Sequence, residues 1–198
     1  MKKLFVLVGL LVLAGKFAAG AASGEQAGQK ENPESNEKVY MIGETGPAGG
    51  LIFYDKGAFS SGWRYLEAAP LEMEFTAKWG ADGEYINGTL QIVGSGKQNT
   101  QLIIERLQEL KETGKAAQLC AALDIGGFKD WFLPSLGELD LMYKNLKVMG
   151  RGGLGNSWYW SSSQNSNYVS AWVQYFGNGS RVYDYKDTTS SVRAIRAF

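Results

Sequence analysis

The stretch from residue 157 to residue 198 constrains this chain most, because its composition suits neither a closed core nor a disordered tail. It reads SWYWSSSQNSNYVSAWVQYFGNGSRVYDYKDTTSSVRAIRAF, and between Ser157 and Tyr185 it is rich in aromatic residues, Ser, Asn and Gly and nearly free of charge. Aromatic rings supply rigid contact area and small polar residues supply adaptable hydrogen bonds, a mixture typical of antibody paratopes. The stretch therefore favours a surface for binding over a site for chemistry.

The composition removes several functional classes. The chain of 198 residues has no histidine, so it lacks the commonest general base and the commonest transition-metal ligand. Its single cysteine, Cys120, allows neither an internal disulfide nor a cysteine-based zinc site. Basic and acidic residues number 20 each, and a nucleic-acid partner would need a basic patch. We expect no catalytic residue, no metal, no cofactor and no nucleic-acid partner.

The first 22 residues predict a secretory signal. Lys2 and Lys3 form a basic region, residues 4–13 form an apolar run, and small residues follow it as in a cleavage site. The run is short for a membrane span, although an uncleaved anchor stays an alternative. Residues 13–16 also resemble a bacterial lipoprotein box in which Lys16 replaces the lipidated cysteine. We expect export to the cell surface or periplasm, with membrane contact only through this segment.

The rest of the chain predicts a tether and one domain. Residues 23–38 are polar and lack apolar periodicity, which is typical of a flexible linker. The domain spans residues 39–198. Its apolar runs at 39–42 and 51–54 flank the turn sequence GETGPAGG and predict a β-hairpin. A further strand is expected at 63–69, and a loop anchored by Trp79 at 72–96.

Helices are expected in the middle of the domain and strands at both ends, which predicts an α+β fold. Asn99 or Thr100 caps a first helix that continues through LIIERLQELKET, and residues 116–123 predict a second. Ser135 and Glu138 have the spacing of a capping box at the start of a third. Short strands are expected afterwards at 158–162, 170–176, 179–185 and 191–198.

Several motifs between residues 39 and 198 occur together in an order that resembles a known family. They are GETGPAGGLIFYDKG, WRYLEAAP, GSGKQNT, CAALDIGGFKDWFLPSLGELDLMYKNL, YWSSS and VRAIRAF. The ordered set resembles the Lcl C-terminal-like domain and, more narrowly, the treponeme-type variable proteins of diversity-generating retroelements. The resemblance implies a C-type lectin-like fold of the subgroup related to formylglycine-generating enzymes, with helices packed on short antiparallel sheets.

The resemblance also implies a mechanism of variation. A reverse transcriptase copies a template repeat, template adenines become random bases, and the copied segment would here encode residues 158–198. The family's fixed frame falls on Tyr159 to Gln164, Ala171, Trp172, Gln174, Phe176, Gly179 and Lys186. The positions between them are the candidate variable, ligand-binding residues: Asn167, Tyr168, Val169, Ser170, Val173, Tyr175, Gly177, Ser180, Val182, Tyr183, Asp184 and Tyr185.

Two features of the sequence agree with this division. Randomised asparagine codons cannot give Trp, Gln, Glu, Lys or Met, and no candidate position carries one of these residues. In YVSAWVQYF, alternate residues face opposite sides of a strand, so we expect Trp172 and Phe176 to face the core and Val173 and Tyr175 to face outward. An exposed aromatic row is costly unless a partner covers it. We expect that partner to be a protein or glycan on another cell.

Other interpretations stay open. The same fold could serve an adhesin or glycan-binding envelope protein of fixed specificity, and in either case we expect a monomer. Core packing could explain Trp158, Trp160 and Trp172, and cross-strand pairing could explain the tyrosines. Formylglycine-generating relatives hold copper with two cysteines, whereas Cys120 stands alone among apolar residues, so we expect a buried thiol and no enzyme. A calcium site is a further alternative, built from four carboxylates: Asp124, Asp130, Glu138 and Asp140.

Overall fold

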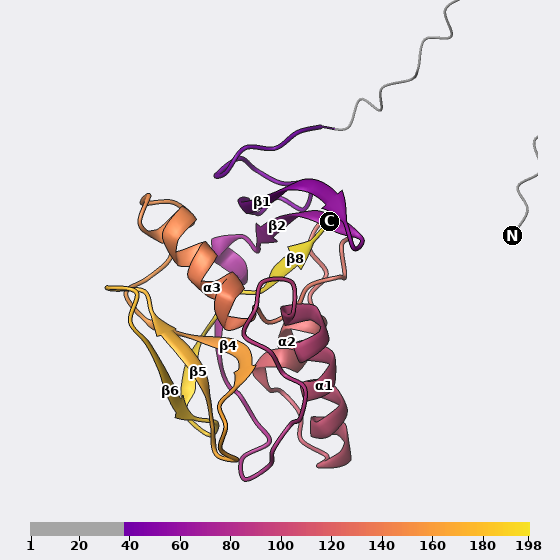
Figure 1. Cartoon of the computed structure of the whole chain (residues 1–198), viewed down its shortest axis with the longest axis vertical. Coiled ribbons are helices and arrows are strands. Elements are labelled where there is room, and N and C mark those ends of the chain that lie inside the picture. The colour runs from indigo at the N-terminus through magenta and orange to yellow at the C-terminus, as the bar shows by residue number, and fades with distance from the viewer. Residues whose placement is uncertain (1–37) are drawn as a thin grey trace, which may run out of the picture. The chain divides into compact units, whose positions relative to one another are not determined.

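The computed structural model describes residues 38–198 of the chain. The predicted signal segment lies outside the described residues, as does the predicted tether up to residue 37. The described part forms three α-helices and two small β-sheets, which confirms the predicted α+β class (Figure 1). None of its helices combines the length and the apolar character that crossing a membrane requires.

The first sheet joins the two ends of the domain. Its strands lie in the order β1 (Leu51–Ser60), β2 (Trp63–Ala68) and β8 (Ile195–Ala197), and both pairs are antiparallel. Ser61 and Gly62 connect β1 to β2 with φ angles of 50° and 81°, a left-handed pair that suits a two-residue hairpin turn. The hairpin therefore lies one strand later than predicted.

The prediction of a β-hairpin around GETGPAGG is wrong, because residues 39–42 form no strand. The chain before β1 instead folds back as a loop, in which Gly43 N–H donates to Ile52 (2.7 Å) and Glu44 O accepts from Ile52 N–H (2.9 Å). The buried Glu67 carboxylate accepts from the backbone N–H groups of Ala48 and Gly50. A side chain thus satisfies backbone donors that a partner strand would otherwise have bound.

The second sheet carries most of the C-terminal part. Its strands are ordered β3 (Phe75–Lys78), β7 (Thr189–Val192), β4 (Trp158–Gln164), β5 (Ser170–Tyr175) and β6 (Arg181–Tyr185). The contact between β4 and β7 is parallel and the other pairs are antiparallel, so the sheet is mixed where antiparallel sheets were expected. Strand β3 lies in a segment that was predicted to be a loop.

The expected final strand at 191–198 is two strands, β7 and β8, which belong to different sheets. The chain changes sheet at Arg193, whose side chain is 1% exposed. Its guanidinium pairs with the Glu74 carboxylate at 2.6 Å and donates to the carbonyls of Ala69 and Gly152. Periodicity alone could not place this break, because the partners of Arg193 come from distant parts of the sequence.

The helices are α1 (Gly96–Glu109), α2 (Ala116–Ala121) and α3 (Leu136–Met142), and α3 continues as a π-helical turn over Tyr143–Lys147. The predicted cap of α1 is wrong, because Asn99 and Thr100 lie inside the helix. The Asn99 side chain instead bonds both backbone groups of Leu90, and Thr100 Oγ1 bonds both backbone groups of Leu133. These side chains join α1 to the loops on either side of it.

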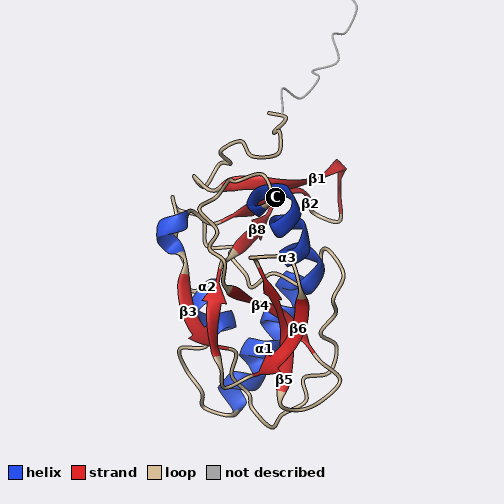
Figure 2. Cartoon of the chain, turned by 90° about the vertical axis from the view of Figure 1, so that its left-hand side faces the viewer, coloured by secondary structure: helices blue, strands red, loops and turns tan. Residues whose placement is uncertain are grey.

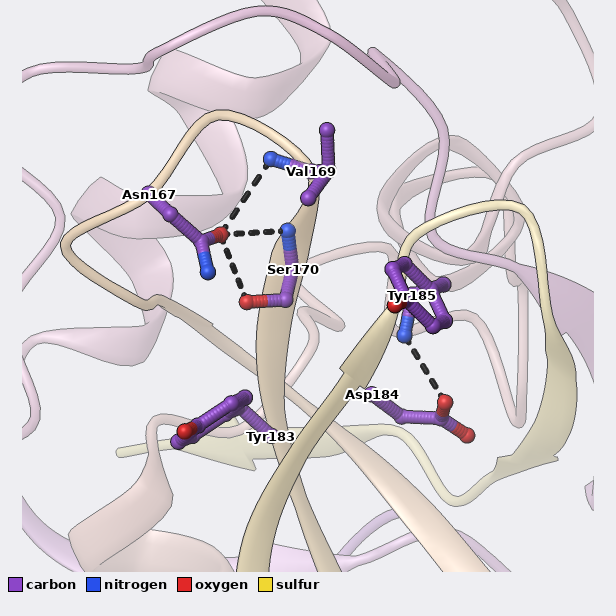
Figure 3. A pocket seen from close by; sticks show the side chains of 6 residues that line it. All are labelled: Asn167, Val169, Ser170, Tyr183, Asp184 and Tyr185. Atoms are coloured by element: carbon purple, nitrogen blue, oxygen red, sulfur yellow. Dashed lines mark hydrogen bonds between the residues drawn. The ribbon is translucent and has the colours of Figure 1, made fainter.

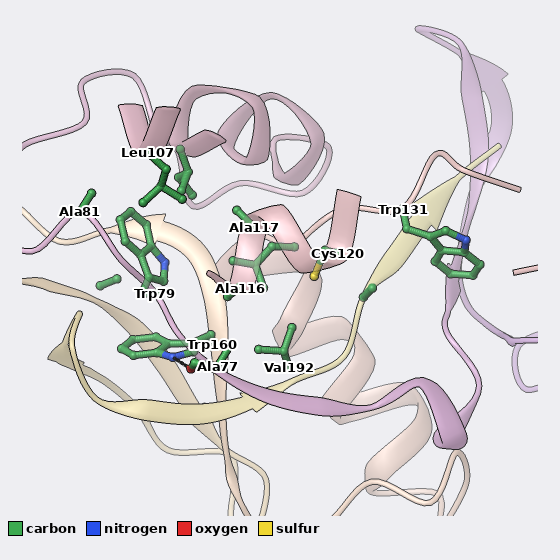
Figure 4. Packing of buried hydrophobic residues seen from close by; sticks show 14 of the residues in the cluster. Ala77, Trp79, Ala81, Leu107, Ala116, Ala117, Cys120, Trp131, Trp160 and Val192 are labelled. Carbon is green, nitrogen blue, oxygen red and sulfur yellow. Dashed lines mark hydrogen bonds between the residues drawn. The ribbon is translucent and has the colours of Figure 1, made fainter. Parts of the chain in front are cut away.

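Strand β4 lies between two hydrophobic clusters, because its neighbouring residues face opposite sides of the sheet. Trp160 belongs to the cluster that also holds Trp79 and Cys120 under α1 and α2 (Figure 4). Tyr159 belongs to the second cluster, with Phe176 and residues of α3. Both buried indoles find acceptors, since Trp79 donates to Ser161 O and Trp160 donates to Ala77 O. The centre of the second sheet is therefore covered on both faces.

The predicted capping box at the start of α3 is confirmed. Ser135 Oγ accepts from Glu138 N–H (3.2 Å), and the Glu138 carboxylate accepts from Ser135 N–H (2.7 Å). The same carboxylate accepts from Gly94 N–H (2.8 Å) and Gly96 N–H (3.4 Å), so it also serves the first turn of α1. Burial raises the pKa of Glu138 above its ordinary value, while the N–H donors of Ser135 and Gly94 oppose that rise.

We predict that Glu138→Ala lowers the free energy of unfolding by about 3 kcal/mol, because it leaves buried N–H donors at the start of two helices without an acceptor. Urea unfolding of the purified protein measures this loss. The matched control is Glu105→Ala, an exposed position on α1, which should change the free energy by less than about 0.5 kcal/mol. Equal effects of the two substitutions would contradict the capping role.

Candidate functional site

The candidate variable residues lie on β5, on β6 and in the loops next to them. Ten of the twelve are exposed or half-buried, and the two buried exceptions are Ser170 and Val173. The fixed frame shows the opposite pattern, since all its members except Trp172 and Gly179 are buried. The division that the resemblance implies thus nearly coincides with the division between surface and interior.

Val173 is wrongly predicted to face outward. It is 1% exposed and packs in the first hydrophobic cluster, opposite Trp160 of β4. Phe176 is buried in the second cluster, as predicted. Trp172 is only half-buried, and its ring meets the ring of Tyr183 edge-on at a centroid distance of 5.8 Å. Alternation could not assign the faces of β5, because both faces are covered at its centre.

Six of the candidate residues gather around one hollow of about 200 Å³ (Figure 3). The turn that precedes β5 forms one side of the hollow, and the C-terminal half of β6 forms the other. The lining residues are Asn167, Val169, Ser170, Tyr183, Asp184 and Tyr185. The other candidates lie elsewhere: Tyr175 packs on the ring of Trp158, and Gly177 and Ser180 lie in the exposed turn between β5 and β6.

Asn167 shapes the rim of this hollow. Its Oδ1 accepts from Val169 N–H (3.2 Å), Ser170 N–H (2.8 Å) and the Ser170 hydroxyl (2.6 Å). An asparagine side chain that bonds the backbone two and three residues ahead mimics a backbone turn and fixes the loop locally. The rim is therefore ordered before any ligand is present.

The loop around the hollow is also held by three successive backbone carbonyls. Asn167 O accepts from Gln164 Nε2 (3.2 Å), Tyr168 O accepts from Lys186 Nζ (2.9 Å), and Val169 O accepts from Lys186 N–H (2.9 Å). Both donors belong to the fixed frame, and all three acceptors are main-chain atoms. These three contacts therefore do not depend on which side chains stand at positions 168 and 169, whereas the side chain of Asn167 adds the bonds described above.

Lys186 is buried, and its ammonium group has four oxygen acceptors. Besides Tyr168 O, these are Ala81 O (3.1 Å), Glu84 O (2.5 Å) and Gln164 Oε1 (3.1 Å). Burial lowers the pKa of Lys186 to about 8, and the nearby carboxylates of Asp82, Glu84 and Glu112 oppose that shift. Lys186 thus joins the loop after β3 to the loop before β5.

Three candidate tyrosines are strongly exposed: Tyr183 and Tyr185 line the hollow, and Tyr168 lies in the turn before β5. Tyr168, Tyr183 and Tyr185 have exposed fractions of 60%, 58% and 64%. Tyr168 packs on Tyr85 at a centroid distance of 5.6 Å, which adds a residue that the sequence analysis missed. Tyr85 lies in a glycine-rich loop that is distant from the candidate segment in sequence, and no local pattern predicts that the two meet. Core packing explains Trp160 but not Trp158, which is 37% exposed.

The carboxylates considered for a calcium site do not form a cluster. Asp130 pairs with Arg196, Asp140 pairs with Lys144, and Glu138 caps two helices. Between residues 38 and 198, no three Asp, Glu or Cys side chains come together in a way that could hold a metal ion. Cys120 is fully buried, and burial raises the pKa of its thiol. The hollow is lined by tyrosine rings, the Asn167 amide, the Ser170 hydroxyl and the Asp184 carboxylate, a mixture that suits contact with a ligand.

Comparison with known proteins identifies the family. The family model described as the Lcl C-terminal domain matches residues 77–196, which is more than half of the chain, and the chain belongs to this family. The match includes the second half of β3, strands β4 to β7, all three α-helices and every candidate position. Strands β1 and β2 precede it, although β2 pairs with β8 in the same domain. No curated protein matches the chain significantly.

We predict that Lys186→Met lowers the free energy of unfolding by about 3 kcal/mol, because it removes the donor from four acceptors around a buried site. Thermal and urea unfolding measure the effect. Lys129→Met is the matched control, since the side chain of Lys129 is 74% exposed and its loss should cost less than about 0.5 kcal/mol. An equal response of both variants would show that the buried ammonium group does not organise these loops.

The pH dependence of unfolding gives a second test. The pKa of Lys186 is about 8 in the folded protein and near 10.5 when unfolded, so between these values the unfolded chain binds more protons. Stability that depends on Lys186 should therefore rise as the pH is raised from 8 to 10.5. Urea unfolding of the wild type and of Lys186→Met over this range isolates the effect as a difference, and a constant difference would contradict the lowered pKa.

Proposed function

We propose that this member of the Lcl C-terminal domain family is an exported ligand-binding protein whose β5–β6 region displays a face that retroelement-driven mutagenesis diversifies. The observation that supports the proposal is the division of the segment by burial. The family's fixed frame packs in the interior, whereas ten of the twelve candidate positions reach the surface. Substitutions at surface positions usually change stability little, so this face can change while the fold persists.

The proposed ligand is a protein or a surface glycan of another cell. The hollow of about 200 Å³ is smaller than the roughly 300–1,000 Å³ typical of pockets for drug-sized molecules. Exposed tyrosines extend beyond its rim, and such rings contribute contact area with little loss of conformational freedom. These features support a shallow contact with a large partner over an enclosed small-molecule site, and binding over catalysis.

The proposal includes a C-type lectin-like fold of the subgroup related to formylglycine-generating enzymes. The α+β architecture with helices packed on two small sheets, and with the ends of the domain joined by β2 and β8, is compatible with that fold. Export is inferred from the predicted signal in residues 1–22.

Sequencing the gene and its downstream neighbours in several isolates tests this function. We expect a near-copy of the segment for residues 158–198 that differs only at template adenines, beside a reverse-transcriptase gene. Substitutions among isolates should concentrate at the twelve candidate codons and spare those for Trp160, Gln164 and Lys186. The codons for β1 and β2 in the same isolates give the background rate.

Absence of any near-copy, or substitutions spread evenly over the domain, would contradict diversification. A conserved segment without a template would instead indicate an adhesin or envelope-binding protein of fixed specificity on the same fold.

A further inference from the structure

Strand β6 forms one edge of the second sheet. It lies outside β5 at the margin of the domain, and β5 is the strand to which it is hydrogen-bonded (Figures 1 and 2). Residues Val182, Tyr183 and Tyr185 of this strand are large and exposed. An edge strand presents one row of backbone N–H and C=O groups that its own sheet does not use.

The register identifies the outward backbone groups. Ser180 O accepts from Tyr175 N–H and Lys186 N–H donates to Val169 O, so the even-numbered residues of this stretch bond to β5. In an antiparallel pair hydrogen-bonded and non-hydrogen-bonded positions alternate, and the register pairs Trp172 with Tyr183. The N–H and C=O groups of Arg181, Tyr183 and Tyr185 therefore point away from the sheet.

One end of this outward row is closed within the domain. Tyr185 N–H donates to Asp184 Oδ1 (2.8 Å), and Tyr185 O accepts from Thr188 N–H (2.9 Å). Arg181 and Tyr183 remain, and their four backbone groups lie along an edge whose two large side chains are exposed. The open part of the edge thus ends next to the hollow that the candidate residues line.

The other sheet edges in residues 38–198 are blocked or shortened. The start of β1 bonds to Gly43 and Glu44, and two register shifts distort the rest of that strand. Strand β8 exchanges both backbone bonds with Phe132. Strand β3 has four residues and ends in Lys78, and short edges with lysine resist pairing. Strand β6 contains neither lysine nor proline.

We propose that β6 binds an extended segment of a partner polypeptide, which pairs with the outward backbone groups of Arg181 and Tyr183 and adds a strand to the sheet. This inference rests on the proposed function and specifies its ligand as a protein with an accessible extended segment. Main-chain hydrogen bonds give affinity in this mode of recognition, and alternate side chains give specificity.

Such an edge suits a surface whose side chains change. The backbone donors and acceptors of positions 181 and 183 persist whichever side chain stands there, so the pairing would survive diversification. On an added strand, ligand residues would lie beside Val182 and Asp184 on one face and beside Tyr183 and Tyr185 on the other. These four are candidate variable positions, so partner choice could change while the mode of docking stays the same.

Two substitutions at position 183 distinguish the contribution of the backbone N–H to peptide binding from that of the side chain. Tyr183→Pro and Tyr183→Ala both remove the ring, but only proline also removes the outward N–H. Proline is tolerated on edge strands where its nitrogen faces away from the sheet. The probe is a phage-displayed library of short linear peptides selected on the full-length protein, and the binding of enriched peptides is then measured on the wild type and both variants.

We expect enriched peptides to bind Tyr183→Pro about tenfold more weakly than Tyr183→Ala, which corresponds to one lost hydrogen bond. Equal binding to the two variants, or no enriched peptide, would overturn the pairing. Thermal unfolding shows whether both variants fold. If the proline variant does not, amide exchange of the wild type with peptide decides, because slowed exchange at Tyr183 supports the pairing and unchanged exchange overturns it.

Failure of the strand pairing and failure of the proposed function give different results. A peptide whose binding Tyr185→Ala abolishes, but which binds the proline and alanine variants of position 183 equally, would leave the binding face in place and exclude the strand pairing. Failure of the proposed function itself would appear in the gene sequences, as an absence of variation at the candidate codons.

Discussion

The region that carries the candidate binding face is held together by the buried side chain of Lys186. Lys186 Nζ donates to acceptors in the loop after β3, at the end of β4 and in the loop before β5, which lie 105, 22 and 18 residues from Lys186 in the sequence. Its backbone N–H also holds Val169 O. A buried lysine is costly unless hydrogen bonds compensate the lost hydration, and here the compensating oxygens are those whose positions define the loop. The hydrogen bonds of Lys186 and the shape of the loop therefore depend on each other.

In this arrangement, backbone hydrogen bonds hold most of the candidate face in place, and its exposed side chains are left for contact with a ligand. Gln164 and Lys186 donate hydrogen bonds to the main-chain carbonyls of residues 167–169. The side chains at positions 167–169 take no part in these bonds. Strand β6 is held to β5 by backbone bonds in the same way. Asn167 is the exception, because its Oδ1 orders the turn, and replacement there would loosen the rim without releasing the loop.

Much of the architecture could be predicted from the sequence, because local signals specify it. The capping box of Ser135 and Glu138 and the α+β order follow from spacing and composition, and the family match confirms the resemblance to the Lcl C-terminal domain. The start of α1, the strand at 75–78 and the sheet change at Arg193 could not be predicted, since they depend on partners remote in sequence. The missed contact of Tyr85 with Tyr168 has the same cause.

The candidate positions are not physically equivalent. Val173 packs against Trp160 in a closed cluster, where a larger residue would cost about 1–3 kcal/mol by overpacking and a polar residue would lose its hydration. Tyr183 and Tyr185 carry no such constraint, because more than half of each side chain is exposed. Among random substitutions in this segment, those at position 173 would therefore be limited by their effect on folding. Those at positions 183 and 185 would be limited only by their effect on ligand binding. The usable diversity of such a surface lies on β6 and the 167–169 loop, where backbone contacts already secure the structure.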